Sequence, residues 1–192
     1  MKRYLMIEIK LNILEHVDLI ESLFSAVVCL HRFEVKNDHS IFMVFESEKA
    51  TDFEGLILNL KTDIFTDIRL YVSPQLHEHD IAEHFDFVQS LLKQISIAKY
   101  AYLDEKIILK DQLLQVTKEH KQHILSKYYQ DQVMLDTVKA YLESNQNMSL
   151  AAKKIYIHRN TLIQRIDKFY QVTDFDVRNF NDAFLIYHIL IK

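Results

Sequence analysis

The sequence predicts an α+β protein, with a sheet domain at the N-terminal end and helices alone toward the C-terminus. Segments with the two-residue alternation of β-strands occur only within residues 1–72. From residue 80 onward, strand signals stop and long helical stretches follow. The chain of 192 residues has one glycine and one proline, so its element boundaries must be inferred from periodicity. With 49% hydrophobic residues, it can form a substantial core.

Residues 1–75 are expected to form one α/β domain. The predicted order is strand, helix, strand, strand, helix, strand, at residues 4–9, 13–24, 26–35, 40–46, 51–64 and 67–72. A turn at 36–39 makes a hairpin of the second and third strands, and Pro74 breaks the chain after the fourth. This is the order of a ferredoxin-like α/β sandwich, whose antiparallel sheet carries both helices on one face.

Residues 76–131 are interpreted as connecting helices. Helical stretches rich in Leu, Ile, Gln and Lys are predicted at 81–97 and 105–129. Their apolar positions are too irregular for a sustained heptad, so no long coiled coil is expected. We expect these helices to pack on another domain or on a partner subunit.

Residues 132–192 are expected to form an all-α domain. A first helix is predicted at 134–144, and the Ser149 hydroxyl is expected to cap a short second helix by accepting a free N–H. A third helix, at 160–170, has Leu162, Ile166 and Phe169 at the i, i+4, i+7 spacing of one buried stripe. This is the pattern of a helix-turn-helix, whose last helix fits the major groove of B-DNA.

Charge is distributed unevenly along the chain. The formal net charge is −4, but residues 1–96 carry 9 Lys and Arg against 16 Asp and Glu, which gives −7. Residues 97–192 carry 14 against 11, which gives +3. Within 149–170, five Lys and Arg stand against a single Asp, which gives +4. Because this basic window covers the second and third helices, it favours duplex DNA as the partner.

The same window carries a specific motif, with NMSLAA at 147–152, IHRNTL at 157–162 and RI at 165–166. These segments resemble the C-terminal helix-turn-helix domain of the PucR/CdaR family of transcriptional regulators, and their core is similar to the DNA-binding end of Fis-type proteins. The resemblance extends from residue 134 to the C-terminus. Tyr156 and Asp174 depart from the general helix-turn-helix pattern, because glycine is common at both turns.

The resemblance implies a DNA-binding transcriptional regulator rather than an enzyme. Longer members of the family carry a degenerate GGDEF-like domain before the helix-turn-helix, and the strand order of residues 1–75 is similar to it. The hairpin at 35–39 has no Gly-Gly-acid-acid-Phe signature. The glycine backbone that would approach a nucleotide and the carboxylates that would bind a metal are therefore lacking. Cyclase activity is not expected.

The recognition helix, at about 159–170, is expected to supply most contacts to DNA. Arg159 is assigned to base reading because its planar fork can pair with guanine acceptors, whereas Asn160 fits a base or a phosphate. The residues assigned to bases are His158, Arg159, Asn160 and Gln164, and those assigned to phosphates are Ser149, Lys154, Thr161, Arg165 and Lys168.

The expected partners are double-stranded DNA and a second copy of the chain, because regulators commonly couple two half-sites. An unknown small molecule or protein could act as effector. The alternative function is a protein-interaction module whose helix-turn-helix no longer reads DNA. Apolar runs too short to span a bilayer, and an N-terminus without a signal core, favour the cytoplasm and no membrane partner.

No metal site, catalytic set or cofactor is expected. His77, His79 and His84 stand near carboxylates, but ten histidines in 192 residues cluster by chance, and the lone Cys29 is not near them in sequence. A single glycine also excludes a Gly-rich phosphate loop.

Overall fold

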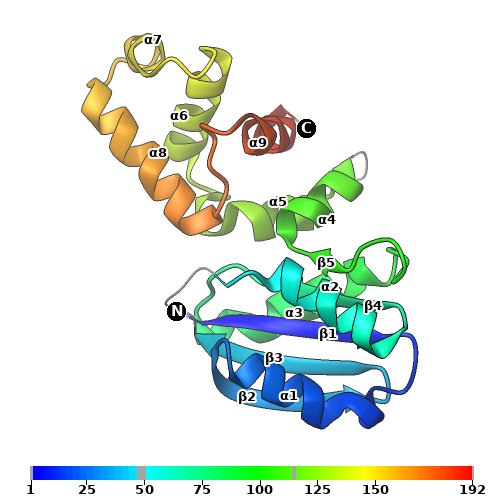
Figure 1. Cartoon of the computed structure of the whole chain (residues 1–192). Helices are drawn as coiled ribbons and strands as arrows, with labels where there is room; N and C mark the ends of the chain where they lie inside the picture. Colours follow the sequence, from blue (N-terminus) through cyan, green and yellow to red (C-terminus); the bar gives the residue numbers. More distant parts are fainter. Residues whose placement is uncertain (1, 47–50, 114–115, 192) are drawn as a thin grey trace. The chain divides into compact units, whose positions relative to one another are not determined.

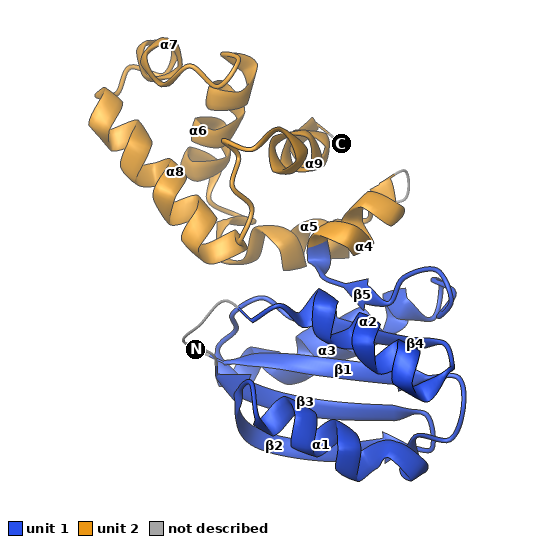
Figure 2. Ribbon diagram, in the orientation of Figure 1, with its two compact units in different colours: residues 1–105 blue, residues 106–192 orange. Residues whose placement is uncertain are grey.

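The computed structural model describes residues 2–46, 51–113 and 116–191. They form two compact units, residues 1–105 and 106–192 (Figure 2). Each unit has a hydrophobic core of its own. The predicted α+β class is confirmed, with the sheet in unit 1 and helices alone in the core of unit 2. The sequence predicts three parts, residues 1–75, 76–131 and 132–192, as domains that fold separately. This division stays a prediction.

Unit 1 is built on a five-stranded sheet with the order β2-β3-β1-β4-β5 (Figure 1). Four strands pair with one another in antiparallel fashion, namely β1 (Arg3–Ile9), β2 (Cys29–Asn37), β3 (Ser40–Glu46) and β4 (Ile68–Val72). β5 (Tyr102–Leu103) pairs with β4 in parallel. It has no counterpart among the predicted strands, because two residues carry no periodicity.

Helices cover both faces of this sheet (Figure 1). α1 (Val17–Ser25) and α2 (Phe53–Ile64) share a core with Leu5 and Ile7 of β1. α3 (Ile81–Leu92) lies on the other face. With both faces covered, all of β4 and all but the last residue of β3 are buried, as in sheets with no side facing water.

α3 lies within unit 1, although the sequence pattern places residues 81–97 among connecting helices. Its Phe85 ring stands 5.9 Å from the Tyr4 ring and 5.0 Å from the Phe42 ring, measured between centroids. Its His84 Nδ1 lies 2.9 Å from the Tyr4 hydroxyl. The alternation of β1 and β3 presents Tyr4 and Phe42 on the second face, and α3 removes that aromatic surface from water.

Arg69 of β4 secures the end of α3. Its guanidinium donates to the main-chain oxygens of Leu92, at 2.9 Å, and of Ile95, at 2.6 Å. Its Nε also donates to Glu8 of β1, so the buried charge is paired. Carbonyls at a helix end have no partner within the helix, and Arg69 supplies one for them.

The predicted helical stretch at 105–129 is divided into α4 (Glu105–Asp111) and α5 (Lys118–Leu125). Leu114 and Gln115 of this stretch lie outside the described residues. Thr117 starts α5 by accepting a hydrogen bond from the His120 N–H, while the His120 ring accepts from the Thr117 N–H. This reciprocal cap begins a new helix at this point.

Four further helices complete unit 2: α6 (Gln132–Glu143), α7 (Met148–Lys154), α8 (Arg159–Thr173) and α9 (Phe180–Ile191). The first three were expected from the sequence, with ends that differ by a few residues. They contribute buried residues to one core, which includes fully buried Ile166 and Ile186.

Candidate nucleic-acid interface

The turn between α6 and α7 fixes where α7 begins. Asn145 and Gln146 have φ values of 50° and 60°, and the chain then re-enters a helix. The Asn147 side chain caps α7 by accepting the N–H groups of Ser149, at 3.1 Å, and Leu150, at 3.0 Å. The predicted cap at Ser149 is wrong, because the amide oxygen two residues earlier already accepts these donors. Ser149 lies in the first turn of α7, with its side chain exposed.

A tight turn joins α7 to α8. Ala151 and Ala152 are buried, so their small side chains let α8 approach α7 closely. The Ile157 N–H then donates to the Ala152 oxygen at 3.0 Å. Tyr156 takes a φ of 55°, the left-handed conformation usual for glycine, and its side chain is 95% exposed.

His158 is the N-cap of α8 and lies just outside the helix. Its Nδ1 accepts the Asn160 N–H at 3.2 Å, which leaves Nε2 as the ring atom open to a further partner. The helix begins at Arg159, and the side chains of Arg159, Asn160 and Thr161 are exposed in its first turn. Four of the predicted site residues therefore lie together at one helix start.

α8 has two opposite faces. Leu162, Ile166 and Phe169 are fully buried, which confirms the predicted core stripe. Asn160, Gln164 and Lys168 follow each other at four-residue spacing and are all exposed. We call these three residues with Thr161 the polar stripe of α8. None of their side chains has a partner within the part of the chain that the structure describes.

Arg165 differs from the other residues assigned to phosphates. It is half-buried, and its Nη1 donates to Thr137 Oγ1 of α6 at 2.9 Å. Thr137 is fully buried and donates in turn to the Val133 oxygen at 2.7 Å. The guanidinium therefore ties α8 to α6. No sequence pattern indicates this pair, because its members are distant along the chain.

Lys154 has an acidic neighbour on the surface. Its Nζ lies 2.8 Å from a Glu143 oxygen, and the Lys139 Nζ lies 3.9 Å from the other. The hydrogen bond from Lys154 lowers the pKa of Glu143. Because such exposed pairs are weak, Lys154 can exchange this carboxylate for another anion.

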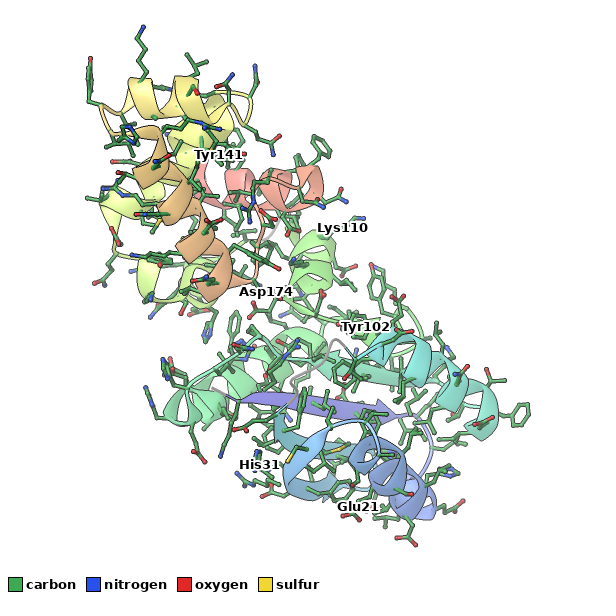
Figure 3. All side chains as sticks on the ribbon, turned by 60° about the vertical axis from the view of Figure 1, so that its left-hand side comes forward. Glu21, His31, Tyr102, Lys110, Tyr141 and Asp174 are labelled. Atoms are coloured by element: carbon green, nitrogen blue, oxygen red, sulfur yellow. The ribbon has the colours of Figure 1, made fainter. Side chains whose placement is uncertain are left out.

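Asp167, the acid within the basic window, is also paired. Arg178 donates to Asp167 at 2.8 Å and to Asp176 at 2.6 Å. Burial opposes ionisation of Asp176, but the hydrogen bonds from Arg178 outweigh it and hold the pKa of Asp176 below its ordinary value. This arrangement offsets the charge of Asp167. Asp174, with a φ of 61°, marks the end of α8 (Figure 3).

The three histidines that stand near one another in the sequence, His77, His79 and His84, do not gather at one point in the structure. The His77 and His79 rings stack with centroids 5.6 Å apart, whereas His84 is buried with its Nε2 2.8 Å from Glu105. Within residues 2–46, 51–113 and 116–191, no three His, Cys, Asp or Glu residues are grouped as metal ligands. No helix in those ranges is long and apolar enough to cross a membrane.

Comparisons with known proteins find relatives in Bacillus subtilis. The purine catabolism regulatory protein of Bacillus subtilis (strain 168) is 43% identical over 47 residues, or 24% of this chain and 9% of that protein. The DNA-binding transcriptional activator AdeR of the same organism is 32% identical over 93 residues, or 46% of this chain and 21% of AdeR. The B. subtilis protein YxkF is 28% identical over 174 residues, or 82% of this chain.

The chain spans 57% of the length of YxkF and smaller shares of the other two proteins. Among solved structures, a regulator of polyketide synthase expression from Bifidobacterium adolescentis aligns with 99% of this chain and 79% of its own. Its TM-score is 0.45 at 16% identity. Residues 134–191, which hold most of α6 and all of α7, α8 and α9, match the family described as the PucR C-terminal helix-turn-helix domain. This part of the chain is therefore a helix-turn-helix domain of the PucR type.

Proposed function

We propose that the protein is a sequence-specific DNA-binding transcriptional regulator and that α8 is its recognition helix. The observation that carries this proposal is the polar stripe of α8, which is exposed and unpartnered beside a helix start rich in donors. The names of two relatives, a purine catabolism regulatory protein and a transcriptional activator, support regulation rather than an enzymatic role.

The proposed contacts follow the exposure of the side chains. Arg159 is the principal reader of a base, because its fork can donate two hydrogen bonds to guanine. His158 would contact a base through Nε2, because its Nδ1 already caps α8. Arg165 has further donors beyond its bond to Thr137. We assign His158, Arg159, Asn160 and Gln164 to bases and Ser149, Lys154, Thr161, Arg165 and Lys168 to phosphates.

The same proposal includes a homodimer in the cytoplasm, with an unidentified effector. A single helix-turn-helix makes few contacts, and two copies gain affinity by binding half-sites about 34 Å apart. Residues 1–75 are proposed as a ferredoxin-like, degenerate GGDEF-like domain, which the order β2-β3-β1-β4 and the antiparallel pairing support. Sedimentation of the full chain should give a dimer, and a monomer both with and without DNA would contradict that part.

Binding is best tested by selecting sequences from random duplex DNA and then titrating the selected site over a series of salt concentrations. Arg159→Ala should cost about 1–3 kcal/mol at that site and relax base preference. Lys168→Ala should weaken binding to all DNA sequences alike. It should also reduce the slope of log affinity against log salt concentration by about one, since one phosphate contact is lost. Lys118→Ala removes an exposed cation outside α7 and α8, so it serves as the matched control and should change neither.

Two results would contradict the proposal. The first is failure of the parent protein to bind any duplex at low salt. The second is unchanged binding by Arg159→Ala when circular dichroism shows that the variant is folded. In either case the alternative gains support, namely a protein-interaction module whose helix-turn-helix no longer reads DNA.

A further inference from the structure

A groove lies on the second face of the sheet in unit 1, between α3 and the edge strand β2. Its volume is about 460 Å³, which is within the usual range for sites that bind small molecules. Phe42 and Val44 of β3 form its floor, and Phe85 of α3 stands over Phe42 with the two rings nearly perpendicular. The floor is therefore apolar and aromatic.

The sequence of β2 explains why this groove exists. Leu30 and Phe33 pack against the core beneath α1 and α2, whereas Arg32 pairs with Val44 in register and belongs to the second face. The register shifts between Leu30 and Arg32, so His31 is the extra residue of a bulge at the sheet edge (Figure 3). The residues of β2 on this face are charged, and they border the groove instead of closing it.

The β2 wall of the groove is basic. The Lys36 ammonium lies 5.1 Å from the centre of the Phe42 ring and 5.8 Å from that of Phe85, and the Arg32 guanidinium lies 5.6 Å from that of Phe42. Both cations share one carboxylate, Glu34, which accepts hydrogen bonds from each. These hydrogen bonds, from Lys36 and then from Arg32, lower the pKa of Glu34. Two positive groups thus converge above an aromatic floor.

The opposite wall is acidic. Asp86 of α3 lines the groove there, together with Glu78, which lies just before α3. Glu78 is paired at 3.1 Å with Lys2, which also lines the groove, so Asp86 gives this wall its net negative charge. The groove therefore has opposite charges on its two walls and an apolar floor between them. A ligand with an anionic group at one end and a hydrogen-bond donor at the other would complement both walls.

We propose that this groove binds a small aromatic carboxylate that carries an amino group at its other end. The carboxylate would pair with Lys36 and Arg32 on the β2 wall, and the flat body would lie against Phe42 and Phe85. The amino group would donate to Asp86 on the α3 wall. The exposed pairs of Glu34 with Arg32 and Lys36 yield readily, because ion pairs in contact with water contribute little. This site is independent of DNA binding by unit 2.

The test is isothermal titration calorimetry of the full chain with 4-aminobenzoate as the probe. Benzoate, which lacks the amine, and aniline, which lacks the carboxylate, are single-group controls. 4-Aminobenzoate is expected to bind with a Kd below about 1 mM and at least about tenfold more tightly than either control. No measurable binding of 4-aminobenzoate, or equal binding of all three compounds, would overturn the proposal.

Variants locate the site. Lys36→Met should lower the affinity for 4-aminobenzoate to about that for aniline. Asp86→Asn should lower it to about that for benzoate. Ala82→Trp adds a bulky side chain to an exposed position on the α3 wall and should abolish binding of all three. Lys61→Met changes a comparable lysine of unit 1 outside this groove and should leave binding unchanged. Unchanged binding by the Lys36 and Ala82 variants would show that the groove is not the site.

Discussion

The two units build their cores from contacts at different distances along the chain. In unit 1, β1 pairs with β3 and β4, so that Leu5 lies opposite both Met43 and Val72. In unit 2, the packed helices α6, α7 and α8 follow one another directly. A motif recognisable in the sequence occurs where the contacts are local. The function of unit 2 can therefore be inferred from a short segment, whereas the groove of unit 1 can be recognised only from the fold.

The largest effect expected is the loss of a core ring in one unit alone. Phe169 is fully buried, and its ring stacks on Tyr128 with centroids 5.9 Å apart. Phe169→Ala should reduce the free energy of unfolding of unit 2 by about 3–5 kcal/mol. Ile7→Ala, at a fully buried position of β1, is the matched change in unit 1 and should cost about 2–5 kcal/mol.

Differential scanning calorimetry of the full chain checks this prediction. Phe169→Ala should move only one thermal transition and Ile7→Ala only the other. If both variants shift a single shared transition, the units unfold together and the comparison between them fails.

Loss of Arg69 should have the next largest effect. Arg69→Met keeps the apolar stem but removes the donors to Leu92 and Ile95 and leaves Glu8 without its partner. We expect a cost of about 3 kcal/mol, together with faster amide exchange in α3 than in β1. Lys61→Met, which breaks an exposed pair with Asp67, should cost less than about 1 kcal/mol. Unchanged exchange in α3 would mean that Arg69 does not anchor it.

The sequence predicts elements better than it predicts what they pack against. The strand and helix order of residues 1–72 follows from local periodicity, and the structure confirms it. The place of α3 does not follow from periodicity, because its amphipathic pattern fits any apolar surface. Only the pairing of the strands brings Tyr4 and Phe42 together on one face. For the same reason, the two walls of the groove cannot be inferred from residues 31–36 alone.

The helix-turn-helix shows the same limit on a smaller scale. The buried stripe of α8 was predictable from spacing, since Leu162, Ile166 and Phe169 repeat with the period of a helix. The cap of α7 was not, because Asn147 and Ser149 are both good capping residues and only the backbone decides between them. The bond from Arg165 to Thr137 likewise depends on how two helices cross.

A smaller effect is expected at the turn before α8. Tyr156 has a φ of 55°, where a Cβ atom is strained, and its exposed ring leaves little packing to lose. Tyr156→Gly should therefore stabilise unit 2 by about 1 kcal/mol. Tyr156→Ala is the control, because it removes the ring but keeps the Cβ, and it should leave stability unchanged. Equal stability of the Gly and Ala variants in chemical denaturation would show that φ is not the source of strain.

The smallest effect concerns pH and should distinguish the two units again. His120 is buried in unit 2, where its ring is hydrogen-bonded to Thr117 and Gln112. Burial lowers the pKa of His120, so the folded form binds a proton less readily than the unfolded chain. Above the ordinary histidine pKa, about 6.5, both forms are neutral and the stability of unit 2 is complete. Below it the unfolded chain takes up a proton first, so the free energy of unfolding falls until the pH drops below the lowered pKa of the folded form.

Denaturation of the full chain between about pH 7.5 and pH 5 measures this effect, a range that includes the ordinary histidine pKa. His120→Gln keeps a hydrogen-bonding side chain but cannot titrate, so the fall in unit 2 stability should become shallower. Lys118→Gln, which changes an exposed side chain of the same helix, is the control and should retain the parent slope. Protonation of Asp176 does not account for the fall. Because the pKa of Asp176 is lowered, this carboxylate stays ionised in the folded form until the pH is more acidic than the measured range. If His120→Gln and the parent lose stability equally, the pH dependence of unit 2 arises elsewhere and the burial of His120 does not control it.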